Sequence, residues 1–204
     1  MQAKKTSIAM TAEEPVIEGP PFRLVSDYSP TGDQPRAIEQ LVGGLGMQDI
    51  VRGANTPTLW TLDALDEFHT SGFRFSGFES VQGGAANDQF VLATAAAGLS
   101  GQLDGGLGND SLRATDAVNF WQIDRAGGGE LFGQTAFRGI ENLTGGLQAD
   151  TFEFFNGGTI AGTVNAAGGS DTLDFSARTS GVAVELANRS VALTVGTFLG
   201  IETI

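Results

Sequence analysis

Four aspartates each close a glycine-rich turn, and their spacing suggests that they act in pairs. The pairs are Asp88 with Asp110 and Asp150 with Asp171, and the separation within each pair is nearly the same. If such turns stack as neighbouring strands do, about 4.8 Å apart, the two carboxylates of a pair lie close together. Carboxylates at that distance repel, so one takes up a proton, turns to solvent or shares a cation. Calcium prefers oxygen ligands of this kind. Alternatively, each aspartate accepts hydrogen bonds from the amides of its own turn and needs no metal.

The turn that contains Asp110 carries the fullest pattern. Residues 105–113 read GGLGNDSLR and match G-G-x-G-x-D-x-U-x at every specified position. This nonapeptide resembles the calcium-binding repeat of RTX proteins. More broadly, residues 43–204 resemble the Gly–Asp arrays of large bacterial surface or secreted proteins. The resemblance implies an extracellular or cell-surface location and bound Ca²⁺, although the turns do not follow one another in tandem as in an RTX β-roll. The predicted metal-site residues are Asp88, Asp110, Asp150, Asp171, Gly105, Gly106, Gly108 and Asn109.

An internal repeat organises these turns. Three residue types recur together at one fixed period: Gly77, Gly139 and Gly200; Glu79, Glu141 and Glu202; Phe75, Phe137 and Phe198. A fixed period held through three copies is typical of solenoid proteins. Each unit divides into thirds of about 20–22 residues, in which alternating apolar residues predict short strands. We therefore expect an all-β fold over residues 43–204, a parallel β-helix (β-solenoid) with three coils per unit.

Such a stack predicts specific neighbours in the core. Inward residues of successive coils form ladders along the axis, because equivalent positions lie one strand spacing apart. We expect the repeating glutamates to stabilise the turns that precede each Gly-Gly pair. The expected neighbours in the core are Phe90 with Leu112, Phe152 with Leu173, and Phe154 with Phe175.

The composition narrows the choice of function. The 204-residue chain has a formal net charge of −13 and an isoelectric point near 4.2. Its only lysines are Lys4 and Lys5, which argues against nucleic acid as a partner of residues 43–204. The chain has no cysteine, so disulfides and thiolate metal sites are excluded. No apolar run is long enough to span a membrane, and no N-terminal signal peptide is recognisable.

The N-terminal part has a different character. Residues 1–21 lack an apolar period and are expected to be disordered. Residues 22–42 include SDYSPTGDQPRAIEQLV, which resembles the extreme N-terminus of UvrB, the damage-recognition ATPase of bacterial nucleotide excision repair. Asp33 as the N-cap and Gly43 as the stop signal predict one short helix. The resemblance implies that Gln34 reads an adenine base. No P-loop motif follows, so ATP hydrolysis is not expected.

Three functions fit these observations. The leading hypothesis is a non-enzymatic structural or adhesive segment of an extracellular repeat protein, with calcium at some Gly–Asp turns and cell-surface or carbohydrate ligands as partners. The first alternative is a nucleotide-binding, UvrB-like DNA-repair fragment, and the second is a carbohydrate-active β-helix enzyme. His69 is the only histidine, so a zinc site would have no second histidine ligand. A nucleophilic serine would have no other histidine as its base. An exposed solenoid end also predicts end-to-end association.

Overall fold

The computed structural model describes residues 23–24, 40–42, 49–131, 133–192 and 194–204, and every regular element in this part of the chain is a β-strand. The expected all-β class is confirmed. Within the same residues, no helix is long and apolar enough to cross a membrane. The expectation that residues 1–21 are disordered falls outside the described residues.

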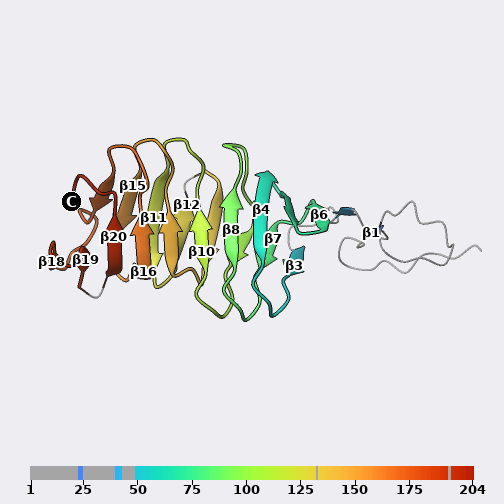
Figure 1. Ribbon diagram of the computed structural model, residues 1–204, viewed down its shortest axis with the longest axis horizontal. Helices are drawn as coiled ribbons and strands as arrows, with labels where there is room; N and C mark the ends of the chain where they lie inside the picture. Colours follow the sequence, from blue (N-terminus) through green and yellow to red (C-terminus); the bar gives the residue numbers. More distant parts are fainter. Residues whose placement is uncertain (1–22, 25–39, 43–48, 132, 193) are drawn as a thin grey trace, which may run out of the picture.

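The strands form two sheets that lie along the long axis of the molecule (Figure 1). In spatial order, the twelve-stranded sheet contains β1 (Arg23–Leu24), β2 (Gln40–Val42), β6 (Phe73–Ser76), β5 (Glu67–Thr70), β4 (Leu59–Ala64), β8 (Gln89–Leu92), β10 (Ser111–Arg113), β14 (Asn142–Thr144), β16 (Ile160–Asn165), β20 (Val195–Leu199), β19 (Ser190–Val191) and β18 (Val184–Glu185). The eight-stranded sheet contains β17 (Thr172–Asp174), β15 (Thr151–Phe154), β11 (Phe120–Arg125), β12 (Gly128–Leu131), β13 (Thr135–Arg138), β9 (Gln102–Asp104), β7 (Ser80–Gln82) and β3 (Ile50–Arg52).

Both sheets are mixed, because parallel ladders are interrupted by antiparallel meanders. The parallel pairs join strands that are far apart in the sequence, as Phe152 with Leu173 and Leu103 with Phe137 show. The meanders β4–β5–β6, β11–β12–β13 and β18–β19–β20 are antiparallel. An uninterrupted parallel β-helix of evenly sized coils is therefore not what the sheets show. One third of each repeat folds as a meander and not as a coil.

Equivalent parts of successive repeats lie in opposite sheets. Trp60 lies on β4 in the twelve-stranded sheet, whereas its equivalent Trp121 lies on β11 in the eight-stranded sheet. Along the chain from β2 to β20, each single strand or meander belongs to the sheet opposite the one before it. The repeat contains an odd number of such passes, namely four single strands and one meander, so each unit begins in the sheet opposite to its predecessor.

The short helix expected before Gly43 is not formed at the end that the structure describes. Gln40–Val42 form strand β2, which pairs in parallel with β6. The rest of the expected helix, residues 33–39, lies outside the described residues. The helix prediction is therefore wrong for its last three residues.

The repeat explains why these residues form a strand. The sequence QLVGGLG, which starts at Gln40, recurs one repeat later as QLDGGLG from Gln102. Strand β9, at the second position, pairs in parallel with β13, as β2 pairs with β6. Hydrogen bonds between strands override the helical tendency of the sequence around Gln40.

The core lies between the two sheets and contains the predicted ladders. Leu112 pairs with Phe90 and Leu173 with Phe152, and all four side chains are fully buried. The rings of Phe154 and Phe175 have centroids 5.3 Å apart. These three expected contacts are confirmed. Since each buried Leu or Phe contributes roughly 1.5–3 kcal/mol, the ladders supply much of the stability that holds the turns in place.

Candidate functional site

The four aspartate turns lie at two opposite edges of the stack. Turns 83–88 and 105–110 lead into β8 and β10, whereas turns 145–150 and 166–171 leave from β14 and β16. These four strands belong to one parallel series in the twelve-stranded sheet. The first two turns therefore lie at the amino ends of the series and the last two at its carboxyl ends. The predicted ligands form two separate groups.

Within the first group, the aspartates are linked by hydrogen bonds between the carboxylate of one turn and the amide of the turn before it. The amide of Asp88 donates to Oδ1 of Asp110 over 2.7 Å, and the amide of Thr58 donates to Oδ1 of Asp88 over 2.8 Å. The amide of Asp110 in turn donates to Oε2 of Glu141 over 2.8 Å. Asp88 is 1% exposed and Asp110 is 0% exposed. The expected proximity of this pair is present.

The second group repeats the arrangement at the opposite edge. The amide of Asp150 donates to Oδ1 of Asp171 over 2.7 Å, and the amide of Asn119 donates to Oδ1 of Asp150 over 2.8 Å. The amide of Asp171 donates to Oε2 of Glu202 over 2.8 Å. Asp150 is 1% exposed and Asp171 is 0% exposed. Each group is therefore a column of carboxylates that accept amide hydrogens from the neighbouring turn.

The repeating glutamates complete the columns and belong to the site. Besides Glu141 and Glu202, Oε2 of Glu79 accepts the amide hydrogen of Asp49 over 2.9 Å. All three glutamates thus receive the amide of an aspartate that comes earlier in the chain. Their period gave the signal in the sequence, but the aspartate that each one serves could be identified only from the structure.

The four turns fall into two types, which differ in what the second carboxylate oxygen does. In turns 83–88 and 145–150, here called capped turns, Oδ2 of the aspartate accepts an amide of its own turn, Gly84 for Asp88 at 2.7 Å and Gly146 for Asp150 at 2.6 Å. In turns 105–110 and 166–171, here called open turns, Oδ2 of the aspartate is buried and has no partner among the described residues. The alternative in which each aspartate accepts an amide hydrogen of its own turn therefore holds for the capped turns alone.

A neighbouring side chain explains the difference. In the open turn 105–110, the amide of Gly106 donates to Oδ1 of Asp104 over 3.1 Å. In the open turn 166–171, the amide of Ala167 donates to Oδ1 of Asn165 over 3.1 Å. The amide that a capped turn would offer to its own aspartate is therefore already used. Oδ2 of Asp110 and of Asp171 remain as buried acceptors for which the described residues supply no donor.

Burial changes the proton affinity of two of the four aspartates, Asp110 and Asp150. Burial raises the pKa of Asp110 from 3.8 to about 6, although the hydrogen bond from the Asp88 amide opposes the shift. The negative charges of Glu141, Asp88 and Asp104 raise it further. Burial also raises the pKa of Asp150, against the hydrogen bonds from Gly146 and Asn119. A group of this kind can hold a proton or, once ionised, a cation.

The remaining predicted ligands lie in the open turn 105–110 with Asp110. Gly105, Gly106 and Gly108 form its backbone, and the last two have positive φ angles of 94° and 135°. The side-chain oxygen of Asn109 accepts a hydrogen bond from the amide group of Asn142. The described residues contain no group of three or more His, Cys, Asp or Glu side chains that could hold a metal. A calcium ion here would depend on backbone carbonyls together with one carboxylate oxygen.

Two aspartates outside the columns, Asp63 and Asp124, contact basic side chains on the meanders. His69 Nδ1 lies 2.7 Å from Oδ2 of Asp63, and Arg74 Nη1 lies 3.6 Å from the same oxygen. At the equivalent position in the next repeat, Arg125 Nε lies 2.7 Å from Oδ1 of Asp124, and this hydrogen bond lowers the pKa of Asp124. Both aspartates therefore contact a basic side chain of their own meander at equivalent positions of the repeat.

Ala167 offers a direct test of the open-turn geometry. It has a φ of 72°, which costs an L side chain about 1 kcal/mol, and its equivalent in the other open turn is Gly106. Because this relief of strain offsets the entropic cost of glycine, we expect Ala167→Gly to leave the free energy of unfolding unchanged or to raise it by up to about 0.5 kcal/mol, measured by urea denaturation. The matched control is Ala161→Gly at an exposed position of strand β16, which is expected to lower it by about 0.5–1 kcal/mol. Equal losses in both variants would contradict the assignment.

Comparison with known proteins gives only short matches. No family model matches the chain, and no solved structure matches it. The chain is 61% identical over 33 residues to UvrABC system protein B of Methanosarcina mazei and 83% identical over 24 residues to that of Listeria monocytogenes. It is 64% identical over 33 residues to that of Chlorobium limicola. These stretches cover 12–16% of this chain and only 4–5% of the relatives' length.

These matches support the resemblance of the N-terminal segment to UvrB and carry no activity over to this chain. Gln34, the residue that the resemblance implied for base recognition, lies outside the described residues. The resemblance of residues 43–204 to RTX arrays has no match behind it and stays a prediction.

Proposed function

We propose that the chain is a non-enzymatic structural or adhesive segment of an extracellular repeat protein, in which calcium binds at the open turns. The observation that carries this proposal is the pair of buried carboxylate oxygens without a partner among the described residues, Oδ2 of Asp110 and Oδ2 of Asp171. They occupy equivalent places in two successive repeats, so they follow from the architecture and are not accidents of one turn. The Gly–Asp pattern supports the extracellular setting and calcium as the ion.

The architecture that suits this role is a β-solenoid with meander insertions. Two features favour it: the alternation of successive passes between two sheets, and parallel pairs that join strands distant from each other in the sequence. In a rod built in this way, each repeat contacts only its neighbours along the axis, and the function lies along the surface of the rod. Its length and stiffness then depend on how well adjacent turns hold together.

Calcium suits the open turns for electrostatic reasons. A buried carboxylate oxygen without a donor is costly when ionised, since desolvation is not compensated by a hydrogen bond. A divalent cation removes that cost and neutralises the nearby charges of Asp88, Asp104 and Glu141. In the capped turns both carboxylate oxygens already accept amide hydrogens. The proposal therefore places ions at Asp110 and Asp171 and not at Asp88 or Asp150.

Calcium titration tests the proposal. At a free calcium concentration ten times the dissociation constant, we expect a stabilisation of about 1.4 kcal/mol per site. The melting temperature would then rise by about 3–6 °C per site, or about 6–11 °C for both sites together, relative to EDTA, with binding heat measured by calorimetry. Asp110→Asn and Asp171→Asn are each expected to remove one site, and the double variant to remove the whole shift.

Asp116→Asn serves as the matched control, because Asp116 is exposed and lies outside both columns. It is expected to keep the full calcium response. A wild-type protein that melts at the same temperature in calcium and in EDTA would contradict calcium binding. A response that survives in the double variant would place the ion elsewhere.

A further inference from the structure

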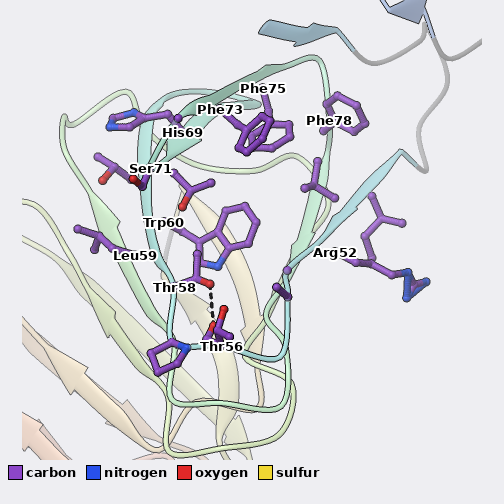
Figure 2. Close-up of a pocket in the computed structure, with 18 residues that line it drawn as sticks. Arg52, Thr56, Thr58, Leu59, Trp60, His69, Ser71, Phe73, Phe75 and Phe78 are labelled. Atoms are coloured by element: carbon purple, nitrogen blue, oxygen red, sulfur yellow. Dashed lines mark hydrogen bonds between the residues drawn. The ribbon is translucent and has the colours of Figure 1, made fainter. Parts of the chain in front are cut away.

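The residue just before each Gly–Asp turn differs between the two types of turn. Asp104 and Asn165 precede the open turns, whereas Gln82 and Thr144 stand at the equivalent positions before the capped turns. Aspartate and asparagine side chains commonly accept a hydrogen bond from the backbone amide two residues later, and threonine does so more weakly. The side chain of Gln82 is used between strands instead: Nε2 donates to Oδ2 of Asp104 over 2.8 Å, and Oε1 accepts from Arg52, which points away from the core (Figure 2). The open turns alone begin with a side chain that takes up an amide of the turn.

The backbone at the second residue of the turn follows the same division. Gly106 and Ala167, whose amides bond to the residue before the turn, have φ angles of 94° and 72°. Their equivalents in the capped turns, Gly84 and Gly146, lie outside the left-handed region. The left-handed conformation thus accompanies the hydrogen bond to the preceding side chain and directs the amide away from the aspartate that closes the turn.

The fourth residue of the turn also separates the two types. Gly108 and Gly169 in the open turns have φ angles of 135° and 138°, which glycine adopts at little cost. A Cβ on either glycine would lie 2.5 Å from a carbonyl oxygen of the capped turn beside it. Ala86 and Gln148 occupy this position in the capped turns and lie outside the left-handed region. An open turn therefore requires glycine here, and a capped turn does not.

The position before an open turn requires an acceptor and not a charge. Asp104 on β9 is in register with Arg138 on β13, and Arg138 Nη2 lies 2.7 Å from Oδ2 of Asp104. One repeat later, the residues in register are Asn165 and Leu199. Neither member of this second pair is charged, yet Asn165 still accepts the turn amide. The hydrogen bond is what the two open turns share.

We propose that Asp104 and Asn165 are positioning residues, which take up the turn amide and thereby leave a carboxylate oxygen of Asp110 and of Asp171 open to a cation. For calcium as the ion, this role rests on the proposed function, whereas the exchange of hydrogen bonds can be observed without an ion. Where the residue before the turn does not hold the amide, Oδ2 of the aspartate that closes the turn accepts it, as in both capped turns. That oxygen is then no longer available to an ion.

Two double variants that differ only at residue 104 test this role. Asp104→Asn with Arg138→Leu copies the pair beside the second open turn, whereas Asp104→Thr with Arg138→Leu copies a residue that precedes a capped turn. In crystal structures determined in EDTA, we expect the asparagine variant to keep the open turn. We expect the threonine variant to place the Gly106 amide on Oδ2 of Asp110. In calorimetry, the asparagine variant is expected to bind two calcium ions, as the wild-type protein is, and the threonine variant only one.

Asp174→Thr is the matched control. The amide of Ser176 donates to Oδ1 of Asp174 over 2.7 Å, so this variant loses the same kind of hydrogen bond outside the four Gly–Asp turns. It is expected to bind two calcium ions. An open turn in the threonine variant, or a capped turn in the asparagine variant, would overturn the proposal. A wild-type protein that binds no calcium, together with the expected change of the turn in EDTA, would contradict the proposed function and support the role of Asp104.

The reverse change in a capped turn gives a second test. Thr144→Asn with Gln148→Gly supplies turn 145–150 with both residues that the open turns share. We expect the Gly146 amide to leave Oδ2 of Asp150 for the side chain introduced at position 144, and a third calcium ion to bind. A crystal structure in which the Gly146 amide still donates to Asp150 would overturn the proposal, even if the variants at residue 104 failed to fold.

Discussion

Replacing Gly105 by alanine is expected to lower the free energy of unfolding by about 3 kcal/mol, because two neighbouring turns meet at its Cα. A Cβ at this position would lie 1.9 Å from the carbonyl oxygen of Gly139 and 2.7 Å from Oδ2 of Asp110. The first contact is with backbone, so no side chain can rotate away to relieve it. The two turns would have to separate, and the hydrogen bond between the Gly105 amide and the Arg138 carbonyl would weaken. Urea denaturation in EDTA measures the effect without any contribution from calcium.

The matched control is Gly181→Ala. A Cβ on Gly181 meets nothing within 4 Å, and its φ is not in the left-handed region. The variant is expected to be unchanged or more stable by up to about 1 kcal/mol, since alanine restricts the unfolded chain. If Gly105→Ala proved as stable as Gly181→Ala, the close approach of the turns would be wrong, and with it the geometry of the aspartate columns.

The neighbouring turns and the core ladders beside them could be predicted from the sequence, because the spacing of the turns sets the register of the strands that follow. A glycine-rich turn followed by aspartate occurs at Asp88 and recurs at Asp110, and each turn starts a short strand with one inward aromatic or aliphatic residue. Once the turns are placed one above the other, Phe90 and Leu112 must meet, as the strand register confirms. This inference needs only the length of a coil and the alternation of side chains.

The meanders could not be predicted in the same way, because alternation of apolar residues is common to parallel and antiparallel strands. In β4 to β6, the inward residues Leu62, Phe68 and Phe75 alternate with polar ones as they would in successive coils. What turns the chain back is local: Asp66 has a φ of 55° and Gly72 a φ of 90°. A sequence shows the glycine, but it does not show whether the strand beyond it stays in the same sheet.

The turn pattern alone does not distinguish capped from open turns, although the residue just before each turn does. Every one of the four aspartates has the same relation to its own turn in the chain. Which carboxylate oxygen lacks a donor depends on whether a residue just before the turn, Asp104 or Asn165, has already accepted the turn amide. The sequence carries this signal, because Asp104 or Asn165 precedes each open turn, whereas Gln82 and Thr144 stand at the equivalent positions before the capped turns.

The second large effect concerns pH and Asp110, whose pKa burial raises from 3.8 to about 6. Because the folded protein binds this proton more tightly than the unfolded chain, the stabilisation is fully present below about pH 4. It is lost as the pH rises through about 6, at up to about 1.4 kcal/mol per pH unit and about 3 kcal/mol in total. Asp110→Asn cannot ionise and keeps an Oδ1 acceptor for the Asp88 amide. In EDTA, we expect the variant to be about 2–3 kcal/mol more stable than wild type at pH 7.5 and close to wild type at pH 4, measured by urea denaturation.

The direction of this effect separates the buried carboxyl from an ordinary salt-bridged one. A carboxylate that is stabilised in its charged form would show the opposite trend, and its replacement by asparagine would destabilise the protein most at neutral pH. Asp116→Asn provides the matched control, because its side chain is exposed and belongs to neither column. An Asp110→Asn variant that is equally stable relative to wild type at pH 4 and pH 7.5 would show that Oδ2 of Asp110 has a donor after all. Adding calcium at pH 7.5 completes the test. We expect calcium to stabilise the wild-type protein through Asp110 and not to stabilise Asp110→Asn at this site. The advantage of the variant in free energy of unfolding should therefore shrink or reverse.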